Sequence, residues 1–143
     1  EIYRVKRFIT LGNEIWKSLD TGDIAEVTRL YNIALSEIPY DDFPNRDEFW
    51  YRSLFLMLLR GAGVIAYAEV HTFKGRSDVV VQFERKVVIL KFKFAEKSSD
   101  VDKKRIEGLE QIRNREYDKA YSVDGRQIIT AVFVANDEAR QVE

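Results

Sequence analysis

A carboxylate and a lysine with a spacing suited to phosphoryl chemistry stand out in this sequence. Asp78 lies within one stretch typical of a strand, just after Gly75-Arg76, and Lys93 lies fifteen residues later in the next one, within Leu90-Lys91-Phe92-Lys93. A carboxylate and a lysine on adjacent strands beside a helix can hold a divalent metal and stabilise charge developing on a reacting phosphoryl group. The helical stretch that follows carries Gln111 and Tyr117. The pattern therefore predicts a candidate site around Asp78 and Lys93.

Three stretches rich in β-branched and aromatic residues would position these side chains, at 64–72, 77–83 and 87–94. Short polar segments at 74–76 and 84–86 join them, which predicts an antiparallel three-stranded meander. Residues 79–81 and 87–90 are continuously apolar, so we expect both of these strands to be covered on both faces.

Helical patterns precede the meander. Asp23 with Glu26 three residues later has capping-box spacing and predicts a helix with one apolar face. Asn45 with Glu48 repeats the spacing and predicts a second helix, which ends at residues 61–63.

A further helix is predicted after the meander, opening at Ser99 with Asp102 three residues later. We expect Gly125 to end the connection after this helix and residues 127–134 to form a last buried strand. The expected core face of the helix comprises Ile106, Leu109, either Ile112 or Arg113, Ala120 and Tyr121.

The order of these elements predicts an α/β fold in which a helix, the meander, a helix and a strand share one mixed sheet. Residues 1–43 are expected to form a helical extension packed on a core of residues 44–143. The length of 143 residues fits one domain, and 13% aromatic content with a net charge of −1 excludes intrinsic disorder.

Composition also excludes several classes of function. The sequence has no cysteine, so disulfides, thiolate zinc sites and cysteine nucleophiles are excluded. His71 is the single histidine and has no partner for a catalytic triad, and no phosphate-binding loop of the P-loop type is present. No window of eighteen or more residues is apolar throughout, so we expect no membrane span and a cytoplasmic location.

The motifs in their order resemble the PD-(D/E)XK nuclease superfamily, and more narrowly the nuclease-like domain that follows an AAA-type ATPase in many bacterial and archaeal proteins. The resemblance runs from about residue 15 to residue 134. It is carried by Ser18-Leu19-Asp20-Thr21-Gly22-Asp23, Glu37-Ile38-Pro39-Tyr40, Glu48-Phe49-Trp50-Tyr51-Arg52-Ser53-Leu54, Ala68-Glu69-Val70, Gly75-Arg76-Ser77-Asp78 and the segment from Glu110 to Tyr117.

The resemblance implies a restriction-endonuclease-like core that hydrolyses DNA with Mg²⁺ or Mn²⁺, normally on the same chain as an AAA-type ATPase. Asp78 matches the metal-binding aspartate, and Glu48 lies where many members place an additional metal ligand. Lys93 matches the lysine that orients the attacking water or neutralises the phosphate. Gln111 and Tyr117 match the residues on the helix beside the site.

Lys91 departs from the family pattern, which has Glu or Asp two residues before the lysine. Residues i and i+2 of a strand share a face, so Lys91 points in the same direction as Lys93. A protonated ammonium cannot ligate a metal, and Mg²⁺ requires oxygen ligands. We therefore expect weak or absent metal binding, with Lys91 supplying the counter-charge, in a catalytically silent domain, whether the lysine is natural or engineered.

Other interpretations of the same residues remain open. Asp78 is also typical of a strand end, and Glu48 of a helix cap. Lys91 and Lys93 are also typical of a solvated stripe on an edge strand. Residues 84–119 hold 11 basic and 8 acidic side chains. This excess of positive charge favours the binding of phosphate backbones, but the same residues could also form ion pairs along a helix, such as Lys103 with Glu107. The alternative function is a non-catalytic module that binds nucleic acid or docks to and regulates the ATPase.

Overall fold

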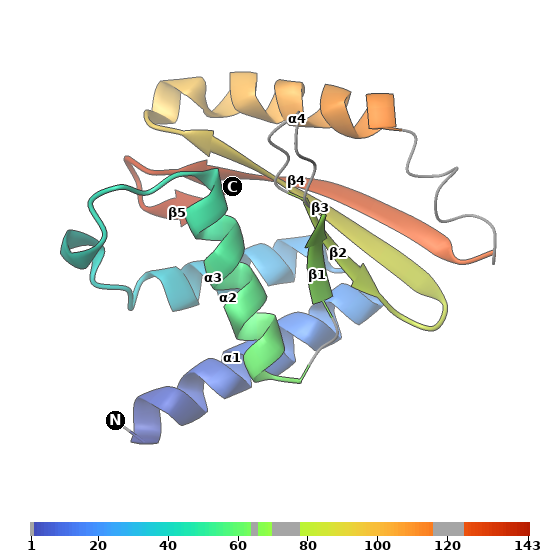
Figure 1. Cartoon of the computed structure of the whole chain (residues 1–143), viewed down its shortest axis with the longest axis horizontal. Coiled ribbons are helices and arrows are strands. Elements are labelled where there is room, and N and C mark those ends of the chain that lie inside the picture. Colours follow the sequence, from blue (N-terminus) through green and yellow to red (C-terminus); the bar gives the residue numbers. More distant parts are fainter. Residues whose placement is uncertain (1, 64–65, 70–77, 116–124) are drawn as a thin grey trace.

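A computed structural model describes residues 2–63, 66–69, 78–115 and 125–143 of the chain (Figure 1). The first helices are α1 (Ile2–Thr21), α2 (Ile24–Leu35), η1 (Tyr40–Asp42), a 3₁₀-helix, and α3 (Glu48–Gly61). They are followed by β1 (Ala66–Glu69), β2 (Asp78–Gln82), β3 (Lys86–Ala95), the 3₁₀-helix η2 (Ser98–Asp100), α4 (Val101–Arg115), β4 (Gln127–Asn136) and β5 (Gln141–Val142).

The strands form one mixed sheet in the order β1-β2-β3-β4-β5. β1, β2 and β3 pair antiparallel, as expected for the meander, whereas β3 and β4 run parallel and are connected through α4. A parallel connection needs such a crossover because the chain must return to the starting end of the sheet. The predicted α/β fold is confirmed, and it is consistent with a restriction-endonuclease-like core that carries additional N-terminal helices.

Helices cover both faces of the sheet (Figure 1). On one face, α1, α2 and α3 enclose the main core with residues such as Leu90, Phe92 and Phe133. On the other face, α4 covers smaller clusters around Ile89 and Val134. Residues 79–81 and 87–90 are all completely buried, so the prediction that these strands are covered on both faces is confirmed.

The two helix starts predicted before the meander have different outcomes. Asp23 caps α2, as predicted, by accepting a hydrogen bond from the Glu26 backbone N–H. The predicted Asn45 cap of α3 is wrong, because Asp47 accepts from the Trp50 N–H at 2.9 Å. Glu48 is therefore the first residue of α3 and has no capping-box position.

The expected core face of α4 is wrong at Ile106 and Leu109 and confirmed at Ile112, which packs against the sheet. Ile106 and Leu109 are 57% and 48% exposed, whereas Gly108 is buried against the sheet. A Cβ atom at position 108 would lie 2.7 Å from Val132 Cγ1, so the absence of a side chain is what allows α4 to approach β4. Ala120 and Tyr121 lie outside the described residues.

The C-terminal part of the chain adds an element that the sequence did not predict. The predicted strand at 127–134 is present as part of β4, but the prediction that it is buried is wrong for 127–132, because only the last four residues of β4 are buried. The edge strand β5 pairs with this buried end. Asn32 of α2 completes β5, donating to the Val142 carbonyl at 2.9 Å and accepting from the Val142 N–H at 2.7 Å. An amide side chain thereby satisfies backbone groups that an edge strand leaves unpaired.

The division at residue 43 stays a prediction. Among the described residues, no helix is long and apolar enough to cross a membrane.

Candidate functional site

Asp78 and Lys91 lie directly opposite each other on β2 and β3. Both are buried, with exposed fractions of 0% and 3%, and Lys91 Nζ lies 3.4 Å from Asp78 Oδ1. A buried charge is strongly disfavoured unless an opposite charge compensates it. The two residues therefore form an ion pair that allows both charges to remain inside the protein.

Lys93 lies on the same face of β3 as Lys91, since alternate residues of a strand share a face. Its side chain is 14% exposed, and its Nζ lies 3.8 Å from Glu107 Oε2 on α4. The edge-strand interpretation of the two lysines is wrong, because β3 lies between β2 and β4 and Lys91 is buried.

Glu48 is half-buried at the start of α3. Burial raises the pKa of its carboxyl group, while the positive charges of Lys93 and Lys91 act in the opposite direction. Glu48 therefore lies within electrostatic range of both lysines. Because Asp47 is the helix cap, capping no longer explains an acid at position 48.

Of the two residues expected on the helix beside the site, Gln111 and Tyr117, the structure describes only Gln111. Gln111 is exposed on α4, one turn after Glu107, and residues four apart lie on the same side of a helix. It is therefore on the side of α4 where Glu107 contacts Lys93. Tyr117 lies outside the described residues, and the roles of both residues stay predictions.

Lys104 and Glu107 join the site although the sequence did not single out Lys104. Glu107, which helical spacing pairs with Lys103, has its Oε2 atom 3.6 Å from Lys104 Nζ and 3.8 Å from Lys93 Nζ. The i,i+3 spacing of Lys104 and Glu107 is a local signal, but their proximity to Lys93 depends on how α4 packs on the sheet.

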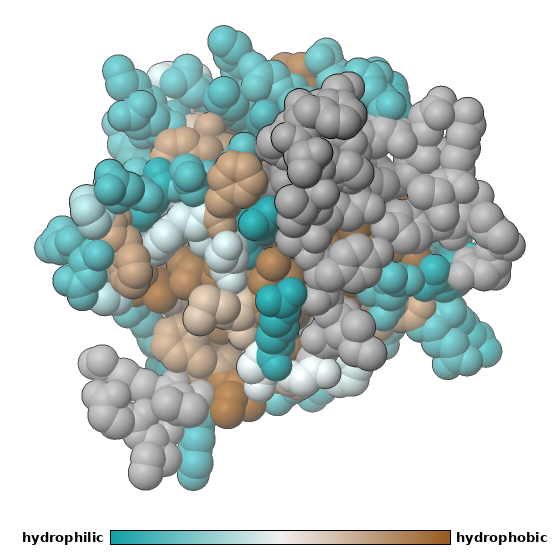
Figure 2. Space-filling model, in the orientation of Figure 1, coloured by the Kyte–Doolittle hydropathy of each residue, from teal (hydrophilic) through white to brown (hydrophobic). Residues whose placement is uncertain are grey.

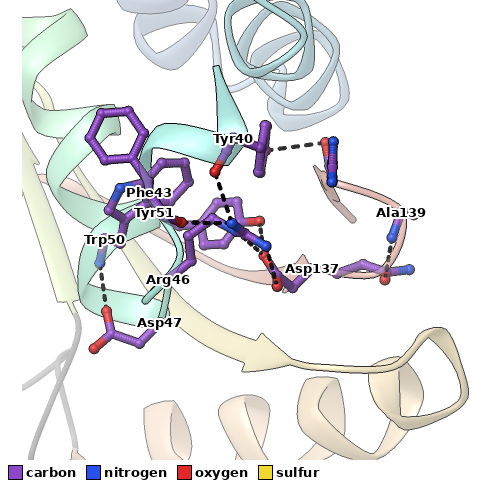
Figure 3. A network of polar contacts seen from close by, with 10 residues as sticks. Tyr40, Phe43, Arg46, Asp47, Trp50, Tyr51, Asp137 and Ala139 are labelled. Atoms are coloured by element: carbon purple, nitrogen blue, oxygen red, sulfur yellow. Dashed lines mark hydrogen bonds and ion pairs between the residues drawn. The ribbon is translucent and has the colours of Figure 1, made fainter. Parts of the chain in front are cut away.

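A second polar cluster lies away from these residues, where the segment before α3 meets the turn after β4 (Figure 3). Arg46 binds Asp137 through two nitrogens, with Nε–Oδ1 and Nη2–Oδ2 distances of 2.7 and 3.0 Å. The same guanidinium donates to the carbonyls of Tyr40 and Phe43, and the Tyr51 hydroxyl donates to Asp137. The cluster fastens residues 40–47 to the C-terminal end of β4.

The electrostatics of this second cluster fit a structural role. Burial acts to raise the pKa of Asp137, but hydrogen bonds from Arg46 and Tyr51 outweigh it and hold that pKa below its usual value. Burial together with the neighbouring Asp137 raises the pKa of Tyr51. All three groups therefore stay in one protonation state near neutral pH.

An apolar groove of about 330 Å³ lies between α1, α2 and α3. Its walls include Ile9, Leu35 and Met57, and Figure 2 shows hydrophobic residues gathered over α3, in contrast to the mostly hydrophilic surface over α4. These helices cover the face of the sheet opposite α4. The groove is therefore separate from the ionisable residues of the candidate site.

The family model described as the PD-(D/E)XK nuclease superfamily matches residues 46–143. The match covers the sheet, α3 and α4, which carry all the candidate site residues described above. The chain belongs to the PD-(D/E)XK nuclease superfamily. Neither a curated protein nor a solved structure matches the chain.

Nucleases of this superfamily generally use Mg²⁺ or Mn²⁺, and the site can be tested for such an ion. Mg²⁺ requires several oxygen ligands in near-octahedral geometry. Within the ranges that the structure describes, no three Asp, Glu or His side chains are grouped so that they could hold a metal. On β3, the residue opposite Asp78 is Lys91, and its ammonium lies 3.4 Å from the Asp78 carboxylate. The described residues around Asp78 therefore do not by themselves fit a catalytic metal ion.

Proposed function

We propose that this chain is a nuclease-fold domain that binds the DNA backbone without hydrolysing it. The observation that supports this function is the buried ion pair between Lys91 Nζ and Asp78 Oδ1. In this superfamily an acid is expected at position 91, and a metal ion would balance the acids. Here the lysine supplies the positive charge, so the fold keeps its site electrostatically balanced without a metal.

Physical reasons favour this exchange of a metal ion for an ammonium group. Two or three carboxylates held together in a partly buried site repel one another and raise their own pKa values. A lysine side chain attached to the central strand removes that repulsion permanently, whereas a metal ion must be bound from solution. This exchange removes the catalytic function, because a protonated lysine does not bind a metal ion and so cannot provide an activated, metal-bound water for hydrolysis.

The charge around the site favours a polyanion. Lys93 and Lys104 lie on the side of the sheet that α4 covers, within a segment in which basic residues exceed acidic ones, 11 against 8 over residues 84–119. Such clusters attract phosphate backbones without reading their sequence. DNA is the polyanion that the family membership favours.

The decisive experiment restores an acid at position 91. We expect the Lys91→Glu variant to gain Mn²⁺-dependent thermal stabilisation and Mg²⁺- or Mn²⁺-dependent nicking of a supercoiled plasmid, neither of which the unaltered chain shows. Lys97→Glu, on the exposed segment after β3, makes the same charge change outside the site. This control is expected to remain inactive and unresponsive to metal.

Two results would overturn the proposal. Metal-dependent cleavage by the unaltered chain would show that Lys91 does not silence it. A folded Lys91→Glu variant with no metal-dependent stabilisation would show that the position is not equivalent to a metal-ligand position. If Lys91→Glu does not fold, Lys91→Gln places a neutral oxygen donor there, and its melting temperature with and without Mn²⁺ decides the same question.

DNA binding is tested separately by fluorescence anisotropy with a labelled duplex. We expect affinity to fall steeply between about 50 and 200 mM salt, as counterion release requires. The alternative, a docking or regulatory module for an AAA-type ATPase, predicts no DNA affinity even at the lower salt concentration, and that result would overturn the DNA-binding proposal.

A further inference from the structure

One oxygen atom of Glu107 lies between two lysines that come from different elements. Oε2 is 3.8 Å from Lys93 Nζ on β3 and 3.6 Å from Lys104 Nζ on α4. The side chain of Lys93 is mostly enclosed by neighbouring residues, with 14% of its surface exposed, whereas the side chains of Glu107 and Lys104 are 37% and 35% exposed. The arrangement is therefore a largely buried lysine and a partly exposed lysine on either side of one partly exposed carboxylate.

Gly108 accounts for this arrangement. A Cβ atom at position 108 would lie 2.7 Å from Val132 Cγ1 and 3.2 Å from Lys93 Cγ. Because Val132 is β-branched and stiff, a side chain at position 108 would push α4 away from the sheet. The glycine brings the preceding residue, Glu107, to the end of the Lys93 side chain.

The carboxylate is held loosely. Charge-assisted hydrogen bonds are about 2.7–2.9 Å long, and both contacts of Glu107 exceed that length by more than half an ångström. Ion pairs that are open to solvent contribute little to stability. A phosphodiester, which carries a full charge and two unesterified oxygens, can therefore replace Glu107 between the lysines at little cost.

We infer that Lys93 and Lys104 form a binding position for one backbone phosphate, and that Glu107 is an internal anion that occupies it when no ligand is bound. The inference rests on the proposed DNA-binding function and adds two residues to it. Lys104 is a phosphate-binding residue. Glu107 competes with the phosphate for the two lysines, so it lowers the affinity for DNA and also hinders the binding of other anions.

The test compares DNA binding by Glu107→Gln and Lys104→Ala variants of the full chain. We expect Glu107→Gln to bind a labelled duplex several-fold more tightly, with a dependence on log salt that is steeper by about 1, as for one added phosphate contact. Lys104→Ala is expected to bind more weakly and to reduce the slope by about 1. It should also abolish the gain when combined with Glu107→Gln.

Arg113→Ala is the matched control. Arg113 is exposed on the same helix, and nine residues of an α-helix place it half a turn around the axis from Lys104. The control removes the same charge from the opposite side of α4, so its effect on affinity should be clearly smaller than that of Lys104→Ala. Equal effects of the two alanine variants would overturn the inference in favour of general charge attraction.

The remaining outcomes separate this inference from the proposed function. If the unaltered chain binds DNA but Glu107→Gln binds no more tightly, the inference is wrong and the proposed function stands. If no variant binds DNA, the proposed function is wrong, and pyrophosphate titrated against side-chain NMR signals of Lys93 and Lys104 tests the anion site alone. NMR shifts that appear at a lower pyrophosphate concentration in Glu107→Gln than in the unaltered chain support the anion site. The absence of such shifts overturns it.

Discussion

Two cation–carboxylate pairs of this protein have similar chemistry but different geometry. Arg46 binds Asp137 with two nitrogens at 2.7 and 3.0 Å, and joins segments that are 91 residues apart in the chain. Lys91 approaches Asp78 at 3.4 Å, between strands that backbone pairing already aligns. The first pair connects segments that no backbone ladder joins, whereas the second lies between two strands that the sheet already pairs.

The difference in geometry indicates that the Arg46–Asp137 pair has the more directional structural role. An arginine fork is the geometry that gives a salt bridge both strength and direction. A lysine is a point charge with no such directional demand. The Lys91–Asp78 pair is explained by the burial of a carboxylate, which requires a positive charge nearby.

The largest expected effect follows from breaking the more deeply buried pair. Lys91→Met removes the ammonium that lies 3.4 Å from the buried carboxylate of Asp78, so we expect the free energy of unfolding to fall by about 3–5 kcal/mol. Adding Asp78→Val should restore most of this loss, because replacing both members of a buried pair is often neutral. Chemical denaturation of the two variants measures both values, and a double variant no more stable than Lys91→Met would contradict this explanation of the pair.

A smaller effect is expected at the second cluster, with a defined dependence on pH. Asp137→Asn removes the charge that Arg46 and Tyr51 stabilise, and should cost roughly 2–3 kcal/mol at neutral pH. The pKa of Asp137 is lowered in the folded state, so its contribution is present above the ordinary range near pH 4 and is lost as pH falls through the folded pKa. Unfolding curves of variant and unaltered chain should therefore converge in acid, and a constant difference at all pH values would contradict the assignment.

The smallest effect has the opposite sign and comes from the candidate site. The pKa of Glu48 is raised by burial, so the fold loses stability from this group as pH rises through its folded pKa. Glu48→Gln should therefore be slightly more stable than the unaltered chain at neutral pH, by a margin within roughly 0.5 kcal/mol, and the margin should shrink in acid. Glu110→Gln, at an exposed position of α4, is the control, and a loss of stability in Glu48→Gln alone would indicate that the two lysines hold the ionised carboxylate.

The strands were predictable because their signal is local. Continuous apolar runs at 79–81 and 87–90 correspond to strands buried on both faces, and alternation along β3 places Lys91 and Lys93 on one face. The start of α3 was not predictable in this way, because Asn45 and Asp47 are both good capping residues. Arg46 selects between them, since its bonds to Asp137 and to the carbonyls of Tyr40 and Phe43 hold residues 40–47 outside the helix.

The exposed side of α4 was misassigned for a comparable reason. Ile106 and Leu109 have the spacing of a core face, but so do Val101, Gly108 and Ile112. The second set packs on the sheet because Gly108 permits a close approach. Periodicity counts apolar side chains and gives no weight to a position where the absence of a side chain matters.

The sequence by itself determined the class of fold, the membership in a nuclease superfamily and the presence of a lysine where an acid is expected. These properties depend on residue order and on short periodic patterns, which act within one element. Only the tertiary structure decided that Lys91 faces Asp78 in a buried pair, that Glu107 lies between Lys93 and Lys104, and that Arg46 reaches Asp137. Such contacts depend on strand register and on the distance between packed layers, because these bring together charges that are far apart along the chain.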